Sequence, residues 1–462
     1  MRRQRALAAV LAVLAVAGCS GATIDGEGIY GTDDATPAPQ AKLSIHFTND
    51  GSVDDLAANA MADIQQYWKT EFPELFDQPY KKIDSFYSID PEDDDGTLPC
   101  VGSADNMRGN AMYCPATDSV LWDRTDFFPV LTKNFGDYAV PMVLAHETGH
   151  AIQDRTHDPG ERTISIETQA DCYSGAFTRA AFSGQAPHFP LTTAELDHAL
   201  GGMLAFADQP GEDPTNPLAH GNAFDRISAF QDGFAYGAAR CADPKYFSDH
   251  RPYTELPYSA SAHPKRDEEQ KGNSPYQESV RLGVKDLTEF WAQFKGWKPL
   301  KDVVGLSENS DQDCGGTPID KALIYCTADN TIYFDAEALP KLHDIAGDFA
   351  VETMLAVAYA FAARHDFGQS TDDQNGLLGA ICYAGAYTHS VFAKPQVHYY
   401  QLSPGDLDEA LQALLVGMTG GSFNGLQDTT GFQRVRAFQV GVKEGFSGND
   451  PDQPGAGCRQ YP

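Results

Sequence analysis

His146-Glu147-Thr148-Gly149-His150 stands between two apolar segments, Val143-Leu144-Ala145 and Ala151-Ile152, and this setting favours a buried helix. Positions i and i+4 share one face of a helix, so the two imidazoles can bind one metal ion side by side. Glu147 points to the adjacent side, where it can take a proton from a water that the metal activates. The alternative to a metal site is a buried core helix in which both histidines form ordinary hydrogen bonds.

The segment Glu167-Thr168-Gln169-Ala170-Asp171, further along the chain, supplies the missing groups. Glu167 offers a third ligand, an oxygen, and Asp171 lies one helical turn later, where it can orient a ligand histidine. Three protein ligands with one open position are typical of catalytic zinc, whereas structural zinc sites have four. We therefore expect one Zn²⁺ per chain, bound by His146, His150 and Glu167.

The chain also contains an internal repeat, which is sought before other features. Four segments recur in the same order at an offset between 208 and 212: residues 110–123 with 321–335, 136–140 with 347–351, 172–178 with 382–388, and 224–230 with 432–438. This pattern indicates a tandem duplication of one domain of about 200 residues, which is within the usual range of domain sizes.

The second copy lacks the polar residues of the first. In the register of the repeat, the positions of His146, Glu147, His150, Glu167 and Asp171 are occupied by apolar residues: Val357, Ala358, Phe361, Leu377 and Ile381. We therefore expect that the framework can fold without metal, and that the five polar residues of the first copy serve more than folding.

Nine cysteines are present, and the repeat predicts how eight of them pair. Eight cysteines permit 105 pairings, so spacing alone does not decide between them. The duplication predicts one short-range and one longer-range bridge in each copy: Cys100–Cys114, Cys172–Cys241, Cys314–Cys326 and Cys382–Cys458.

The N-terminus has the pattern of an export signal. A basic start, Met1-Arg2-Arg3-Gln4-Arg5, precedes an apolar stretch over residues 6–17, which is too short for a permanent membrane span. The stretch ends at Val16-Ala17-Gly18-Cys19, which looks like a bacterial lipobox, in which cleavage precedes a cysteine that is then lipidated. We expect a lipid-anchored protein on the extracytoplasmic face of the cell membrane, where disulfides persist.

The composition excludes one class of partner. The formal net charge is −32, with 65 acidic against 33 basic residues, and no basic patch argues for nucleic-acid binding. The charge is most simply that of a soluble exported surface.

The hydrophobic patterns predict a mainly α fold (α+β) with few short strands. We expect a signal over 1–18, a tether over 19–40, a first domain over 41–245, a linker over 246–280 and a second, degenerate domain over 281–462. Helices are expected over 52–72 (ending before Pro73), 140–155, 167–182, 191–206 and 223–239, and a strand over 119–122.

The motifs together resemble the bacterial neutral zinc metallopeptidase family (HExxH…ExxxD). The resemblance covers roughly residues 95–240 and rests on motifs that come in order: Tyr113-Cys114-Pro115, Asp123, Ala145–Gln153, Glu167–Gly175, His220-Gly221, Arg226 and Phe230. It implies a zincin-like fold, with His146 and His150 as metal ligands, Glu147 as the catalytic glutamate and Glu167 as the downstream ligand. The degenerate second copy departs from the family pattern.

The function we expect is zinc-dependent hydrolysis of peptide bonds in a peptide or protein substrate at the cell surface. Such hydrolysis usually needs a further donor for the tetrahedral intermediate, and His220 is the one candidate, although a structural histidine near a helix start fits it as well. Two alternatives stay open: a non-catalytic surface scaffold whose second domain binds a partner, and a zinc amidase acting on cell-wall material.

Overall fold

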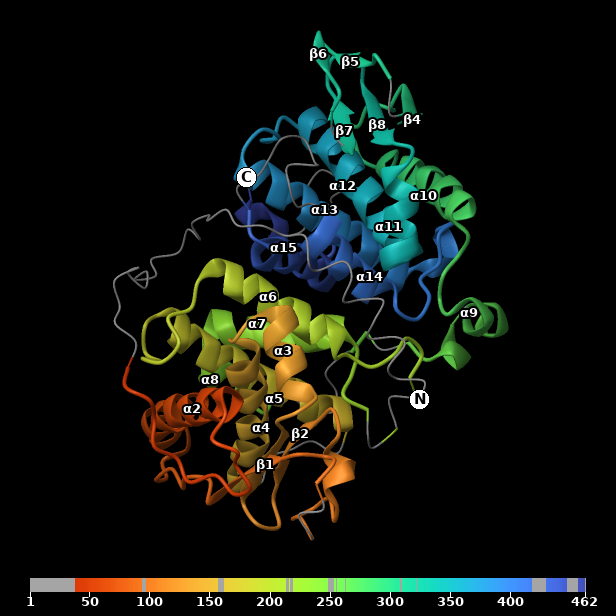
Figure 1. The fold of residues 1–462 in the computed structure, drawn as a ribbon. Coiled ribbons are helices and arrows are strands. Elements are labelled where there is room, and N and C mark those ends of the chain that lie inside the picture. The colour runs from red at the N-terminus through yellow and green to blue at the C-terminus, as the bar shows by residue number, and fades with distance from the viewer. Residues whose placement is uncertain are drawn as a thin grey trace. The chain divides into compact units, whose positions relative to one another are not determined.

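A computed structural model gives the fold (Figure 1). The structure describes residues 38–93, 97–156, 162–212, 216, 219–247, 253–254, 256–261, 263–307, 310–320, 322–417, 429–446 and 456–461. The expected signal, Cys19 and most of the expected tether lie outside the described residues.

The described chain forms two compact units. The N-terminal unit contains residues 38–208 and the described part of 213–254, and the C-terminal unit contains residues 209–212 and 256–461. Residues 256–280, which the sequence predicts to be part of a linker, thus belong to the C-terminal unit by their contacts. This segment contains helix α9 (Pro264–Gln270) and the start of α10 (Tyr276–Trp291).

The N-terminal unit is mainly helical and has one small sheet. Strand β3 (Ser119–Asp123) lies at the centre, parallel to β1 (Ser85–Ile89) and antiparallel to β2 (Ala111–Cys114), so β2 is an edge strand. The helices are α2 (Ser52–Phe76), α3 (Phe127–Phe135), α4 (Ala139–Thr156), α5 (Thr163–Phe182), α6 (Thr193–Ala205), α7 (Ala223–Tyr236) and α8 (Ala238–Cys241).

Several expected boundaries are wrong by about one turn. Helix α2 continues past Pro73 to Phe76, because a proline near a helix end costs one hydrogen bond and the last turn still closes through Asp77 N–H to Pro73 O. Helix α5 begins at Thr163, a full turn before Glu167. Both acids of the candidate site therefore sit inside a rigid helix rather than at its frayed start.

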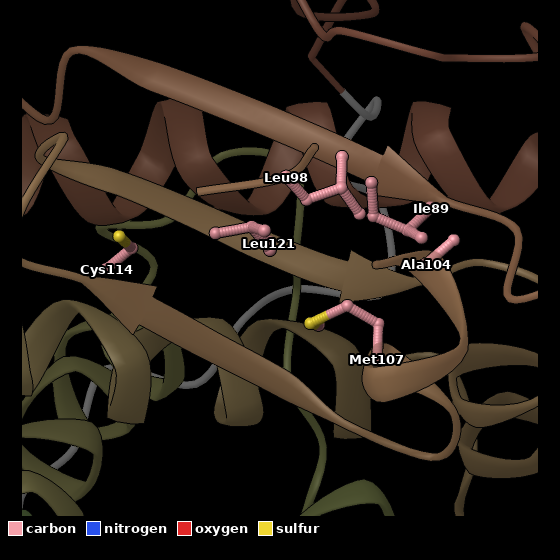
Figure 2. Packing of buried hydrophobic residues seen from close by; sticks show 6 residues of the cluster. All are labelled: Ile89, Leu98, Ala104, Met107, Cys114 and Leu121. Carbon is pink, nitrogen blue, oxygen red and sulfur yellow. The ribbon is translucent and has the colours of Figure 1, made fainter. Parts of the chain in front are cut away.

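A small apolar cluster fixes the loop that precedes β2. Figure 2 shows its members on the three strands and on the loop with its 3₁₀ turn η2 (Ala104–Met107): Ile89, Leu98, Ala104, Met107, Cys114 and Leu121. All six are at most 4% exposed. The Cys100–Cys114 disulfide ties the same loop to β2, so the strand nearest to α4 is held both by packing and by a covalent bond.

The C-terminal unit repeats this order of elements. Its sheet has the order β4-β8-β7, with β4 (Asp302–Leu306) parallel and β7 (Leu323–Cys326) antiparallel to β8 (Thr331–Asp335). A two-stranded hairpin, β5 (Asp313–Cys314) and β6 (Thr317–Pro318), is added. The helices that follow are α11 (Ala338–Ala346), α12 (Asp348–Asp366), α13 (Gln374–Ala393), α14 (Asp406–Gln412) and α15 (Gly431–Glu444).

Four disulfides are present, and their pairings are those that the repeat predicts: Cys100–Cys114, Cys172–Cys241, Cys314–Cys326 and Cys382–Cys458. None of the described helices combines the length and apolarity that a bilayer span requires.

Glycines bring two helices into backbone contact in each unit. A Cβ at Gly175 of α5 would lie 1.9 Å from Phe230 O of α7, and one at Gly233 of α7 would lie 1.9 Å from Cys172 O of α5. In the C-terminal unit, Gly385 and Gly441 make the equivalent contacts between α13 and α15, at 2.2 and 2.0 Å. No larger residue fits at such distances, so α7 can approach α5 closely only because these positions are glycine.

We expect Gly175→Ala to lower the free energy of unfolding by at least about 2 kcal/mol, because the methyl group must push α7 away from α5. The matched control is Gly202→Ala on α6, where the nearest atom to an added Cβ is 3.5 Å away. There the higher helix propensity of alanine should leave stability equal or raised by up to about 1 kcal/mol. Denaturant unfolding measures both, and equal stabilities for the two variants would contradict the packing argument.

Candidate metal centre

The site lies where α4 and α5 pack together. Gly149 of α4 meets Ala170 of α5 there, and a Cβ at Gly149 would lie 2.8 Å from Ala170 Cα. Gly149 lies between the two motif histidines, and Ala170 lies between the two acids of α5. The close contact of the two backbones therefore brings the histidines and the acids together.

Three candidate ligands converge at this contact. His150 Nε2 is 3.1 Å from His146 Nε2 and 3.6 Å from Glu167 Oε1, and His146 Nε2 is 3.3 Å from Glu167 Oε2. The side chains of His146, His150 and Glu167 are only 10, 20 and 13% exposed. The ligand set expected from the sequence is thus assembled in space.

These distances fit one tetrahedral ion. Ligands about 2.0–2.1 Å from zinc lie about 3.3 Å from one another. Glu167 Oε2 is buried and accepts no hydrogen bond from the described residues. A buried carboxylate oxygen without a donor is costly, and a bound cation would satisfy it. Two imidazoles and one carboxylate are a donor set of catalytic zinc.

Asp171 holds the ring of His146. Its Oδ1 lies 2.8 Å from His146 Nδ1, on the opposite side of the ring from the ligand nitrogen Nε2. An ionised carboxylate only accepts hydrogen bonds, so Nδ1 must carry a proton. This arrangement leaves Nε2 as the nitrogen that faces the metal position, which is the role that the sequence predicts for Asp171.

Arg226 of α7 completes this support. Its Nε and Nη2 donate to Asp171 Oδ2 and Oδ1 at 2.8 and 3.1 Å, and the Asp171 side chain is 2% exposed. Burial by itself raises the pKa of Asp171, but the charges of Arg226 and His146 hold the pKa well below its usual value. The sequence names Arg226 only as part of the family resemblance and gives it no role, because an arginine, Arg434, stands at the same place in the metal-free copy.

The ionisable groups of the site are strongly coupled. Burial alone would lower the pKa of His146, but the Asp171 carboxylate and the hydrogen bond to it raise the pKa to about 10. Burial alone would raise the pKa of Glu167, but the charges of His150 and His146 lower it to about 2. In the metal-free protein near neutral pH, His146 is therefore cationic and Glu167 anionic.

Glu147 is anchored by the edge strand. Its Oε2 accepts a hydrogen bond of 2.8 Å from the backbone N–H of Tyr113 in β2, and the residue is 8% exposed. One carboxylate oxygen is thus fixed by the sheet, on the helix that also carries the two histidines. The sequence gives no direct signal for this contact, which depends on how the sheet packs against α4.

His150 has its own support. Its Nδ1 lies 2.8 Å from Gln153 Oε1, and the Gln153 amide donates to Ile166 O at 2.7 Å and to Gln169 Oε1 at 3.0 Å. Gln169 in turn donates to Cys241 O at 3.0 Å. A chain of amides thus fixes the second histidine as Asp171 fixes the first. Gln153 has a sequence signal, since it lies one turn after His150 on the same helix.

The structure does not place His220 among the ligands. Its side chain is 51% exposed, and its Nδ1 lies 3.8 Å from Asp208 Oδ1. Its N–H and that of Gly221 both donate to Asp208 Oδ2. His220 is nevertheless close enough for its charge to contribute to the lowered pKa of Glu167.

A second group of carboxylates, in the C-terminal unit, has a different character. Asp348, Asp406 and Glu409 offer oxygens within 4.8 Å of one another. These oxygens accept hydrogen bonds from backbone groups, including Phe349 N–H at the start of α12 and Ser403 N–H. Without a histidine, the donor set does not suit zinc. We assign the group to capping α12 and the turn before α14.

The replaced residues of the second copy are core residues. Val357, Ala358, Phe361, Leu377 and Ile381 are at most 1% exposed. In the register of the repeat, the Gln153–Gln169 pair becomes Arg364 and Gly379, and a Cβ at Gly379 would lie 2.1 Å from Arg364 Nη1. A buried guanidinium thus fills the space of the two amides, and the equivalent of the site is closed.

The chain matches the family described as putative neutral zinc metallopeptidase over residues 4–244. It is 31% identical over 157 residues to the uncharacterized protein Rv2575 of Mycobacterium tuberculosis, covering 28% of this chain and 53% of that protein. It is 27% identical over 164 residues to the uncharacterized protein YpfJ of Escherichia coli, covering 30% of this chain and 55% of that protein.

The chain thus spans about half the length of the curated relatives it matches. No solved structure matches it. The family match covers more than half of the chain and includes both helices of the candidate metal centre. The chain therefore belongs to the neutral zinc metallopeptidase family.

Proposed function

We propose that this chain hydrolyses peptide bonds with a zinc ion held by His146, His150 and Glu167. The observation that carries the proposal is the convergence of these three side chains beside Glu147. A zinc ion bound there would supply Lewis acidity, lowering the pKa of a water molecule and polarising the carbonyl to be attacked.

The residues of the chain have separate tasks in this reaction. Glu147 takes the proton of the attacking water and passes it to the leaving amine. The Tyr113 N–H holds one oxygen of that carboxylate in place. Asp171, kept ionised by Arg226, fixes the tautomer of His146. The amide chain that begins at Gln153 does the same for His150.

The edge strand favours a peptide over other amides. Among the described strands, β2 pairs with β3 alone, and Tyr113 on β2 donates its backbone N–H to Glu147. An extended peptide can add to an exposed strand edge through backbone hydrogen bonds, which brings its amide bonds next to the edge. Cell-wall material that lacks a regular extended backbone cannot use this mode.

We also propose that the protein acts on the extracytoplasmic side, attached through Cys19. The four disulfides support export, because such bonds persist in oxidising compartments. The small residues before Cys19 support lipidation rather than simple secretion.

We expect Glu167→Ala and Glu147→Gln to separate metal binding from turnover. The wild-type chain from residue 20 onward should bind one zinc. Glu167→Ala should bind zinc more than about a hundredfold more weakly, since removing a ligand exceeds the effect of a supporting residue. Glu147→Gln should keep its zinc but lose at least about a hundredfold in peptide hydrolysis.

Metal analysis and a peptide-library assay measure these effects, with the exposed Glu74→Gln on α2 as the control that should match the wild type. A wild type that binds no zinc after reconstitution would move the assignment to a non-catalytic scaffold. Full activity in Glu147→Gln would refute the role of that glutamate. Hydrolysis of cell-wall amides but of no peptide would identify an amidase.

Zinc binding should release the proton that His146 holds in the metal-free protein, because its pKa is raised to about 10 and the metal replaces the proton on Nε2. Below pH 10, each released proton makes zinc binding about tenfold tighter per pH unit of increase. Calorimetry in buffers of different ionisation enthalpy counts the protons. Asp171→Asn removes the charge that raises this pKa and should release about one proton fewer; an unchanged count would contradict the coupling.

Lipidation is tested by growing cells that express the full-length protein with labelled palmitate. We expect label in the wild type and none in Cys19→Ser, with the label mapped to the N-terminal peptide. Label that persists in Cys19→Ser would refute attachment at this cysteine.

A further inference from the structure

A serine, a histidine and an aspartate form a hydrogen-bonded series in the C-terminal unit. Ser390 Oγ, in the last turn of α13, lies 2.9 Å from His398 Nε2. His398 Nδ1 lies 2.7 Å from Asp286 Oδ2 of α10. The three residues come from separate segments, and His398 directly follows the 3₁₀ turn η4 (Pro395–Val397).

Asp286 fixes which nitrogen of the neutral His398 ring carries the proton. Its side chain is 2% exposed and also accepts hydrogen bonds from the Tyr387 hydroxyl and the Tyr399 N–H. Because an ionised carboxylate only accepts, His398 Nδ1 carries the proton and Nε2 of the neutral ring is left as an acceptor for the Ser390 hydroxyl. A hydroxyl bonded to a base that a carboxylate orients is the arrangement of an activated nucleophile.

The serine end of this series is less buried than the acid end. The His398 side chain is 3% exposed, whereas Ser390 is half-buried. Three of the most exposed large apolar residues among those described lie near Ser390 or His398 in sequence. Phe392, at 46%, follows Ser390 by two residues, and Val397 at 62% and Tyr399 at 41% stand on either side of His398. Exposed apolar groups beside a polar reactive group are typical of a site that binds an apolar ligand.

The N-terminal unit contains the same pair without the serine. At the matching position, His188 Nδ1 lies 2.7 Å from Asp63 Oδ1, and the His188 N–H donates to Asp63. In the register of the repeat, Ser390 corresponds to Ala180, and His188 Nε2 lies 3.0 Å from Pro39 O instead. The His–Asp pair is therefore a shared feature of both units, and the nucleophile is specific to the second.

We propose that Ser390 is the nucleophile of a second, metal-independent site that transfers acyl groups from esters with an apolar acyl chain. His398 Nε2 accepts the Ser390 proton as Oγ forms a bond to the ester carbonyl carbon. The carbon–oxygen bond to the alcohol then breaks, and the alkoxide takes that proton from His398. Water, activated in the same way, hydrolyses the acyl-serine to release the acid. Asp286 acts as a positioning residue.

The test treats the full-length protein with an alkyl fluorophosphonate in the presence of a chelator and maps the modified peptide by mass spectrometry. We expect one modified residue, Ser390, in the wild type and equally in Glu147→Gln, since the reaction does not use the zinc site. Failure of the peptidase assay would therefore leave this result unchanged. Absence of label at Ser390 in the folded wild type would overturn the proposal.

Two variants distinguish an activated Ser390 from a serine that is merely exposed. His398→Gln should slow labelling of Ser390 by at least about a hundredfold. His188→Gln, at the equivalent pair of the N-terminal unit, should leave the labelling rate at the wild-type value. Thermal unfolding establishes that both variants are folded. Equal labelling rates in wild type and His398→Gln would show an unactivated surface serine and overturn the proposal.

The positioning role of Asp286 is tested by a spectroscopic measurement, because removing a purely structural residue would also slow the labelling of Ser390. The ¹H spectrum of the wild type should contain downfield Nδ1–H signals from His398 and from His188, besides that of His146 at Asp171. Asp286→Asn should remove the first and keep the second, together with a slower reaction at Ser390. Loss of neither signal, or wild-type labelling in this variant, would remove Asp286 from the site.

Discussion

A buried carboxylate, Asp171, connects the three helices that carry the candidate metal centre. It lies on α5, accepts a hydrogen bond from His146 of α4 and forms a two-point ion pair with Arg226 of α7. Removing one partner from such a pair leaves a buried charge uncompensated, at a cost of about 3–5 kcal/mol. The orientation of the first ligand and the pairing of the buried Arg226 thus depend on the same side chain.

The metal-free copy shows what this constraint is for. With Ile381 in place of Asp171, the arginine is kept but turns to the backbone, where Arg434 donates to the carbonyls of Leu414 and Thr429. The α13–α15 contact persists through Gly385 and Gly441. The glycine contacts therefore suffice for the helix pair, and the ion pair of the N-terminal unit serves the ligand. Glu352 of the same copy is neutral near pH 7, because burial, opposed by the Tyr387 hydrogen bond, raises its pKa to about 8.

The site residues that could be predicted from the sequence are those whose pattern lies within a short stretch of the chain or recurs in the repeat. The spacing of His146 and His150, the turn between Glu167 and Asp171, and the repeated cysteines all follow from local periodicity or from comparing the chain with itself. The parallel pairing of β1 with β3 does not, because it joins segments that are distant in sequence and β1 has no turn signal of its own. The Tyr113–Glu147 contact likewise depends on tertiary packing. The role of Arg226 is hidden because the residue has a counterpart in the metal-free copy, and the end of α2 is misplaced because the helix continues for one more turn past Pro73.

Each of the four disulfides among the described residues closes within one unit. No disulfide of the described chain bridges the interval between Cys241 and Cys314. Oxidative folding can therefore finish in one unit before it begins in the other, without a wrong cross-link having to be undone. A single proteolytic cut in that interval would also leave two fragments, each with its own bridges intact, one carrying the histidine motif and the other carrying Ser390.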